Sequence, residues 1–141
     1  MLKMVILFDL FNIPDDIFGV IFATNQQKIV AKLLINHIKE NGGEIGKTEM
    51  SLFATRLHEG NLIAEIEEPS YKGKKVKLSY NKRQFYDGIL TPMKSMGIIN
   101  YNLYKKTYKI SDHFNNEMLK IGMMWLEELK KPASKSKIKF I

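Results

Sequence analysis

The sequence predicts an α+β fold that is mainly helical. Apolar residues recur at intervals of three and four in segments 25–40 and 111–131, as they do when a helix buries one face. Segments 62–80 and 100–111 each carry a basic turn between two short arms, which is typical of a β-hairpin. The chain has 141 residues, 45% of them hydrophobic, and is therefore long enough to bury one core.

The first elements lie at the start of the chain. Charged residues and Pro14 interrupt the apolar run MLKMVILFDLFNIPDDIFGVIFA, so no uncharged stretch approaches the roughly 20 residues of a membrane span. We therefore expect a buried N-terminal element, and neither a targeting signal nor a membrane span. Within this run, IPDDIFGVIF predicts a short helix with Pro14 in its first turn and aspartates at its positive end.

Two longer helices and a hairpin follow. Segment 25–40 predicts a helix, because its apolar residues fall at helical spacing and Gly42-Gly43 ends it. Segment 47–58 predicts another helix, which Gly60-Asn61 ends. In segment 62–80, apolar residues alternate along both arms, and Pro69 with Gly73 supplies the turn of a hairpin.

The last predicted element is an amphipathic helix. Ser111 or Asp112 can cap its start. Its apolar stripe consists of Met118, Ile121, Trp125 and Leu129. We expect residues 1–131 to form a single domain whose ends carry packing or dimerisation elements, and residues 132–141 to form a basic flexible tail.

Segment 82–96 predicts a helix that a proline interrupts. Its buried stripe would consist of Phe85, Ile89, Met93 and Met96. Pro92 costs about 3 kcal/mol in a helix interior, and Gly88 weakens the helix further. We therefore predict a kinked or two-part helix that breaks after Leu90, with Thr91 capping a second turn that starts at Pro92.

This region resembles winged-helix DNA-binding proteins of the broad MarR/PadR kind. The resemblance rests on NKRQFYDGILTPMKSMGII, which has a polar helix start, apolar residues at helical spacing and a glycine before an apolar pair. NYNLYKKTYKIS follows in the position of the wing, and DHFNNEMLKIGMMWLEEL in that of the helix that often comes next. The resemblance implies a winged helix-turn-helix with β-hairpin wings, added N- and C-terminal helices, and binding to double-stranded DNA.

Positive charge is concentrated in the same region. The whole chain has a formal net charge of +7, whereas segment 71–110 has ten Lys or Arg against one Asp, a local charge of +9. Cations that cluster on a helix and a hairpin are typical of a surface that binds DNA. The predicted DNA-binding residues are Lys82, Arg83, Gln84, Tyr86, Lys94, Tyr104, Lys105, Lys106 and Lys109.

These residues have different expected roles. Arg83 and Gln84 would contact bases, because their side chains hydrogen-bond to base edges, while Lys82, Tyr86 and Lys94 would hold phosphates or groove walls. The wing would combine phosphate contacts from its lysines with packing in the groove by the interleaved tyrosines Tyr101, Tyr104 and Tyr108.

A second helix–hairpin unit has the same order of features and is the alternative DNA-reading unit. It consists of the helix at 47–58 and the hairpin at 62–80. Its candidate DNA-binding residues are Arg56, Lys72, Lys74, Lys75 and Lys77.

Other chemistries have no complete pattern in the sequence. There are no cysteines and three scattered histidines, so we expect no metal site and no cofactor. GGEIGKT has three residues between its first glycine and Gly-Lys-Thr, where a phosphate-binding loop needs four. Nothing resembles a nucleophile held by a base and an orienting group, and we expect that the protein is not an enzyme.

The apolar stripe of the last helix has two interpretations. It packs on the domain's own core, or it pairs with the same helix of a second subunit, and we expect the homodimer. The leading hypothesis is a cytoplasmic, nucleoid-associated, sequence-specific double-stranded DNA-binding protein that regulates transcription as a homodimer. The alternative is a winged-helix module that binds a protein partner in a replication, repair or transcription assembly. A third hypothesis is attachment to an anionic membrane surface.

Overall fold

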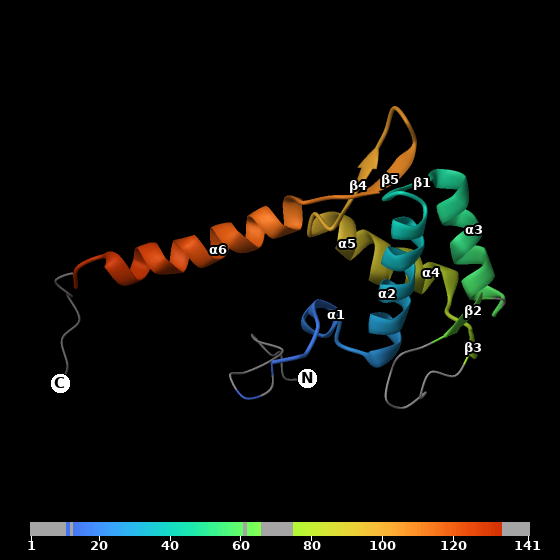
Figure 1. The fold of residues 1–141 in the computed structure, drawn as a ribbon, viewed down its shortest axis with the longest axis horizontal. Coiled ribbons are helices and arrows are strands. Elements are labelled where there is room, and N and C mark those ends of the chain that lie inside the picture. The colour runs from blue at the N-terminus through green and yellow to red at the C-terminus, as the bar shows by residue number, and fades with distance from the viewer. Residues whose placement is uncertain (1–10, 12, 61, 66–74, 134–141) are drawn as a thin grey trace.

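The computed structural model describes residues 11, 13–60, 62–65 and 75–133. They form an α+β fold that is mainly helical, as the sequence predicts, and it includes a small three-stranded antiparallel sheet (Figure 1). The helices are α1 (Ile17–Ile21), α2 (Asn25–Glu40), α3 (Lys47–His58), α4 (Lys82–Phe85), the π turn η1 (Tyr86–Leu90), α5 (Thr91–Ser95) and α6 (His113–Lys130). The strands are β1 (Glu44–Gly46), β2 (Leu62–Glu65), β3 (Lys75–Leu78), β4 (Ile99–Asn102) and β5 (Thr107–Ile110). The predicted buried element at 1–10, the first hairpin's turn and nearly all of the predicted tail lie outside the described residues.

Side-chain caps set where the first helices begin. Asp16 caps α1, and its Oδ1 accepts a hydrogen bond from the Gly19 N–H at 3.1 Å. Pro14 lies two residues before this cap, so its predicted place in the first turn is wrong: the capping carboxylate decides where α1 begins. Thr24 and Gln27 form a capping box at the start of α2. Both α2 and α3 have the bounds that the sequence predicts.

The three-stranded sheet joins distant parts of the chain. Its strand order is β1–β5–β4, and both pairs of neighbours are antiparallel. Ile45 is paired with Tyr108, and Tyr108 with Tyr101, so these three side chains share one face of the sheet. Ile45 and Tyr108 are buried, and this face therefore covers the core.

Strands β2 and β3 form the first predicted hairpin. They are antiparallel, with Leu62 opposite Leu78. The hairpin lies between α3 and α4 in the chain, and at its end the Tyr80 N–H donates a hydrogen bond to the Leu57 carbonyl of α3 at 2.9 Å. The chain thus returns to α3 before α4 begins.

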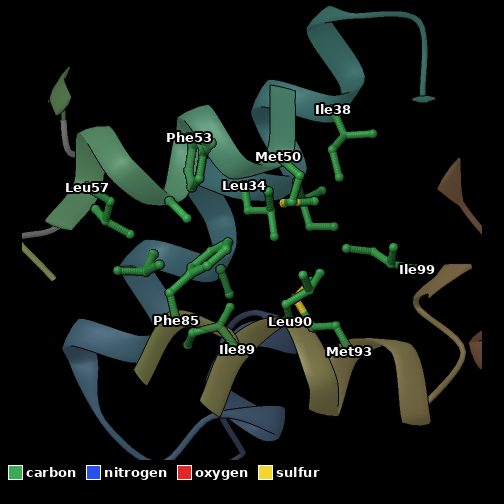
Figure 2. Packing of buried hydrophobic residues seen from close by; sticks show 14 of the residues in the cluster. Leu34, Ile38, Met50, Phe53, Leu57, Phe85, Ile89, Leu90, Met93 and Ile99 are labelled. Carbon is green, nitrogen blue, oxygen red and sulfur yellow. The ribbon is translucent and has the colours of Figure 1, made fainter. Parts of the chain in front are cut away.

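One hydrophobic core is shared by α2, α3, the helical segment 82–95 and the sheet (Figure 2). Phe85 is fully buried, and its ring centroid lies 5.6 Å from that of Phe53 on α3. Each large apolar side chain buried in this way contributes roughly 1.5–3 kcal/mol to folding. The core residues labelled in Figure 2 are Leu34, Ile38, Met50, Phe53, Leu57, Phe85, Ile89, Leu90, Met93 and Ile99.

Helix α6 projects away from the other helices (Figure 1), and none of its residues is buried. Among the described residues, backbone hydrogen bonds attach its start to the domain: the Phe114 N–H donates to the Gly97 carbonyl at 3.2 Å, and the preceding Ser111 N–H donates to the Ile98 carbonyl at 2.9 Å. The interpretation that its apolar stripe packs on the domain's own core is therefore wrong, because the chain leaves the core after the first turn of α6.

The start of α6 is capped differently from the prediction for Asp112. The Asp112 side chain makes no capping hydrogen bond, whereas Ser111 Oγ accepts one from the His113 N–H at 3.2 Å. Within the residues that the structure describes, α6 and the other helices all fall short of the length and apolarity needed to cross a membrane.

Candidate nucleic-acid interface

Residues 82–95 pass from α4 through the π turn into α5 as one helical segment. The Thr91 N–H donates to the Tyr86 carbonyl, five residues back. In a regular α-helix Pro92 would clash with the carbonyl of Gly88 and leave it without a donor, and the π turn avoids that register immediately before the proline. The predicted irregularity is present as a π turn over Tyr86–Leu90, whereas the break predicted after Leu90 is wrong, because Leu90 and Thr91 both have helical angles. The predicted Thr91 cap is wrong, because Thr91 itself has helical angles and makes no capping bond.

The π turn also determines which side chains are buried. Phe85 and Leu90 are five residues apart, a separation of about 140° around a regular α-helix. The longer π turn brings them to the same side, and both are buried. Met96, predicted to extend the buried stripe, is only half-buried. The outer side carries exposed polar residues four apart: Arg83, Asp87, Thr91 and Ser95.

The start of the 82–95 segment is fixed to α3. The Lys82 N–H donates to His58 Nδ1 at 3.0 Å, and Lys82 Nζ donates to Thr55 Oγ1 at 3.3 Å. Lys82, predicted to contact phosphates, therefore bridges two helices and is half-buried. It sets the position of α4 on α3.

The predicted base-contacting residues, Arg83 and Gln84, come next in the chain after Lys82. Asn81 Oδ1 accepts hydrogen bonds from the N–H groups of Arg83 (2.8 Å) and Gln84 (3.2 Å), which caps α4. The Arg83 side chain is 91% exposed, and Gln84 and Lys94 are also exposed. Tyr86 differs from these: it is half-buried and its ring packs edge-on against Phe85, so most of it belongs to the core.

The β4–β5 hairpin presents a basic tip with a defined backbone. Asn102 Oδ1 accepts hydrogen bonds from the N–H groups of Tyr104 (2.9 Å) and Lys105 (3.0 Å). Lys106 has a positive φ of 55°, and its carbonyl accepts a hydrogen bond from the Lys47 N–H at 2.9 Å. Tyr104 is 98% exposed, and Lys105 and Lys106 are exposed beside it. These three side chains are presented to solvent by a tightly hydrogen-bonded turn.

The other two tyrosines of this hairpin point inward. The rings of Tyr101 and Tyr108 contact each other at a tilt of 46°, with centroids 4.6 Å apart; Tyr108 is buried, and Tyr101 packs against the core. Burial raises the pKa of the Tyr108 hydroxyl, and the neighbouring Tyr86 and Tyr101 add to this effect. The interpretation that these two tyrosines pack in a DNA groove is therefore wrong, and Tyr104 alone of the three is exposed.

Lys109 lies on the opposite face of the sheet from these tyrosines. It neighbours Tyr108 along β5 and is paired with Glu44 and Asn100 on the adjacent strands. Lys109 is exposed, but a carboxylate rather than further cations accompanies it on this face. Lys109 thus belongs to a strand of the sheet, whereas Lys105 and Lys106 belong to the turn of the hairpin.

The alternative DNA-reading unit shares its core with the first one. Arg56 is exposed on α3, and Lys75 and Lys77 belong to β3, while Lys72 and Lys74 lie outside the described residues. The β2–β3 hairpin leads from α3 back to α3 and then into α4. The two helix–hairpin units are therefore consecutive parts of one fold, and only the second hairpin pairs with β1.

The prediction of the interface omitted Asp87. Its Oδ2 lies 3.6 Å from Arg83 Nε, and its side chain is 72% exposed. The spacing of four between Arg83 and Asp87 in the sequence is itself a signal for such a pair on a helix. The exposed side of the 82–95 segment thus carries a carboxylate beside its arginine.

The histidines have local structural partners. His58 holds the start of α4, and His37 Nε2 lies 3.3 Å from Glu49 Oε1 while its ring contacts Phe53. Over residues 11, 13–60, 62–65 and 75–133, no three His, Asp or Glu side chains gather in a way that could hold a metal ion.

No protein-family model, curated protein or solved structure matches the chain. Its function is therefore inferred from the residues and geometry described above.

Proposed function

We propose that the chain is a winged-helix protein that binds double-stranded DNA and regulates transcription. The observation that carries this proposal is the order α2, β1, α3, helical segment 82–95, β4, β5, with β5 paired between β1 and β4. In the helix-turn-helix mode of binding, the second helix of the unit lies in the major groove. Here that helix is the 82–95 segment, the β4–β5 hairpin is the wing, and the β2–β3 hairpin is an insertion before the helix.

The exposed side chains have the chemistry that DNA binding needs. Arg83 and Gln84 are suited to donate to base edges, and Lys94 to a phosphate. Lys105 and Lys106 at the wing tip would contact the backbone on one side of the recognition helix. Lys82 and Tyr86 support this surface through packing and hydrogen bonds.

The salt dependence of DNA affinity tests the proposal. Each phosphate contact contributes a slope of about 0.9 in a plot of log affinity against log salt concentration. The double variant Lys105→Ala/Lys106→Ala is expected to bind more weakly, with a slope lower by about 1 to 2, measured by fluorescence anisotropy on duplex DNA.

The matched control is Lys120→Ala/Lys130→Ala, which removes the same charge from two exposed positions on α6. It is expected to retain the wild-type slope. Equal losses in both double variants would show that net charge alone drives binding, and an unchanged slope in the first would exclude the wing tip as a phosphate contact.

We also propose that α6 mediates homodimerisation. The stripe residues Ile121, Trp125 and Leu129 are 57%, 61% and 62% exposed, and Met118 is 43% exposed. Contiguous exposed apolar side chains mark interaction sites on soluble proteins. A two-fold dimer would present two recognition helices to half-sites about 34 Å apart, one turn of DNA.

A protein-interaction module is the second candidate, and the same exposed face of α6 favours it. In that case α6 would bind a different protein in a nucleic-acid assembly. Selection from a random pool of duplex DNA separates the two: a palindromic site supports the dimeric regulator, whereas the absence of any enriched sequence supports the module.

A further inference from the structure

The exposed carboxylate of Asp87 lies on the helical segment that we propose enters the major groove, beside Arg83. Between Asn81 and Met96 the sequence has three cations and this single acid. A carboxylate near the phosphate backbone is repelled, so its presence weakens binding to DNA of any sequence. The neighbouring Arg83 offsets part of that repulsion, and a hydrogen-bond donor on a base edge would offset more of it.

The helical spacing positions Asp87 for such a contact. Arg83, Asp87 and Thr91 follow one another at intervals of four, so they lie in line along the helical segment, and all three are exposed. The Arg83 and Asp87 side chains are 91% and 72% exposed, so both can reach a ligand that faces this side.

Base chemistry distinguishes among the possible partners. The major-groove edge of cytosine offers an amino donor at N4, whereas adenine has the acceptor N7 beside its N6 amino group, which repels a carboxylate. Guanine offers two acceptors, O6 and N7, that suit arginine. An arginine and an aspartate one helical turn apart therefore match guanine and cytosine.

We propose that Asp87 is a specificity-determining residue that accepts a hydrogen bond from cytosine N4 while Arg83 binds guanine. This inference rests on the proposed DNA binding and deepens it by naming the base that one side chain selects. The 3.6 Å contact between Arg83 Nε and Asp87 Oδ2 holds the two groups side by side in the free protein.

A purely structural role for Asp87 makes a different prediction. As an exposed ion pair four residues apart on a helix, the Arg83–Asp87 pair would slightly stabilise the helix and leave base preference unchanged. Base preference is therefore the measurement that distinguishes the two roles.

The test is selection from duplex oligonucleotides with a randomised centre, followed by affinity measurements with single-base variants of the selected site. Wild type is expected to prefer cytosine at one position of the site by about fivefold or more. Asp87→Ala is expected to lose this preference and to bind unrelated DNA more tightly. Asp87→Asn is expected to replace cytosine with adenine, because an amide pairs with adenine N6 and N7.

Asp112→Asn is the matched control, since it removes one exposed carboxylate from outside the recognition helix. It is expected to keep the cytosine preference. If wild type selects a sequence and Asp87→Ala selects the same one, the role of Asp87 is overturned while DNA binding stands. If wild type binds no DNA, the proposed function itself is wrong, and this inference falls with it.

Discussion

The 82–95 segment and α6 are both helical stretches with apolar residues on one side, yet they meet opposite surroundings. In the first, Phe85, Ile89 and Met93 are fully buried against α2 and α3. In the second, which is longer, Trp125 and Leu129 are more than 60% exposed. Apolar periodicity thus establishes that a helix has a face to bury, and it leaves open what covers that face.

The difference comes from what precedes each helix. The 82–95 segment starts with Lys82 hydrogen-bonded to α3 and continues along the core. Helix α6 starts at the close approach of His113 to Gly97 and then leaves the domain. Its exposed apolar residues extend beyond the predicted stripe and include Leu119, Met123, Met124 and Leu126.

The largest expected effect is in the buried segment. Phe85→Ala removes a fully buried ring, and we expect it to lower the free energy of unfolding by about 3–5 kcal/mol. Urea denaturation followed by circular dichroism would measure this loss. A loss below about 1 kcal/mol would contradict the packing of the 82–95 segment into the core.

The next effect concerns association through α6. Trp125→Ala is expected to weaken the proposed homodimer by about 2 kcal/mol or more, roughly 30-fold in its dissociation constant, because a central tryptophan contributes strongly to interfaces. Sedimentation equilibrium over a dilution series would measure it.

Met123→Ala is the matched control for this variant. Met123 is 54% exposed and lies two residues before Trp125, on the other side of the helix. It is expected to leave association nearly unchanged. A monomeric wild type, or equal effects from both substitutions, would contradict dimerisation through the predicted stripe.

A smaller effect is expected where the two regions meet. Gly97 has a φ of +81°, and a Cβ there would lie 2.8 Å from His113 Cβ. Gly97→Ala is therefore expected to destabilise the protein by about 1–3 kcal/mol. Thermal unfolding monitored at 222 nm would show it.

Gly122→Ala is the control for Gly97→Ala, because a Cβ added at this position in α6 meets no atom within 4 Å other than neighbouring residues and backbone of its own helix. In an unpaired helix the substitution is expected to stabilise by about 0.5–1 kcal/mol. Destabilisation of the dimer by Gly122→Ala would instead indicate that a partner helix approaches closely at this glycine. If Gly97→Ala were tolerated as well as Gly122→Ala, the close junction between α5 and α6 would be contradicted.

Much of the local structure follows from the sequence alone. The bounds of α2 and α3 follow from apolar spacing and terminal glycines, because these signals act within a few residues. The pairing of β2 with β3 follows from alternation around a turn. Pro92 likewise predicts an irregular helix, because proline itself lacks an N–H and clashes with the carbonyl four residues before it.

The form of that irregularity was decided by the tertiary structure. Phe85 and Leu90 are both buried in the core, and the π turn brings both side chains to that side. No local sequence rule predicts this turn. The Arg83–Asp87 pair, by contrast, follows from a spacing of four that the sequence itself contains.

Some features of the candidate site likewise follow from the sequence, whereas others depend on the tertiary structure. The sequence by itself determined the cluster of cations and the exposed Arg83 and Gln84, because charge and polarity are read directly from residue types. Only the tertiary structure shows that Tyr108 is buried in the core and that Lys109 lies on the opposite face of the sheet. It alone also shows that the apolar side chains of α6 are exposed. Those outcomes depend on strand register and on the direction in which a helix leaves the core, and both are set by contacts between residues far apart in the chain.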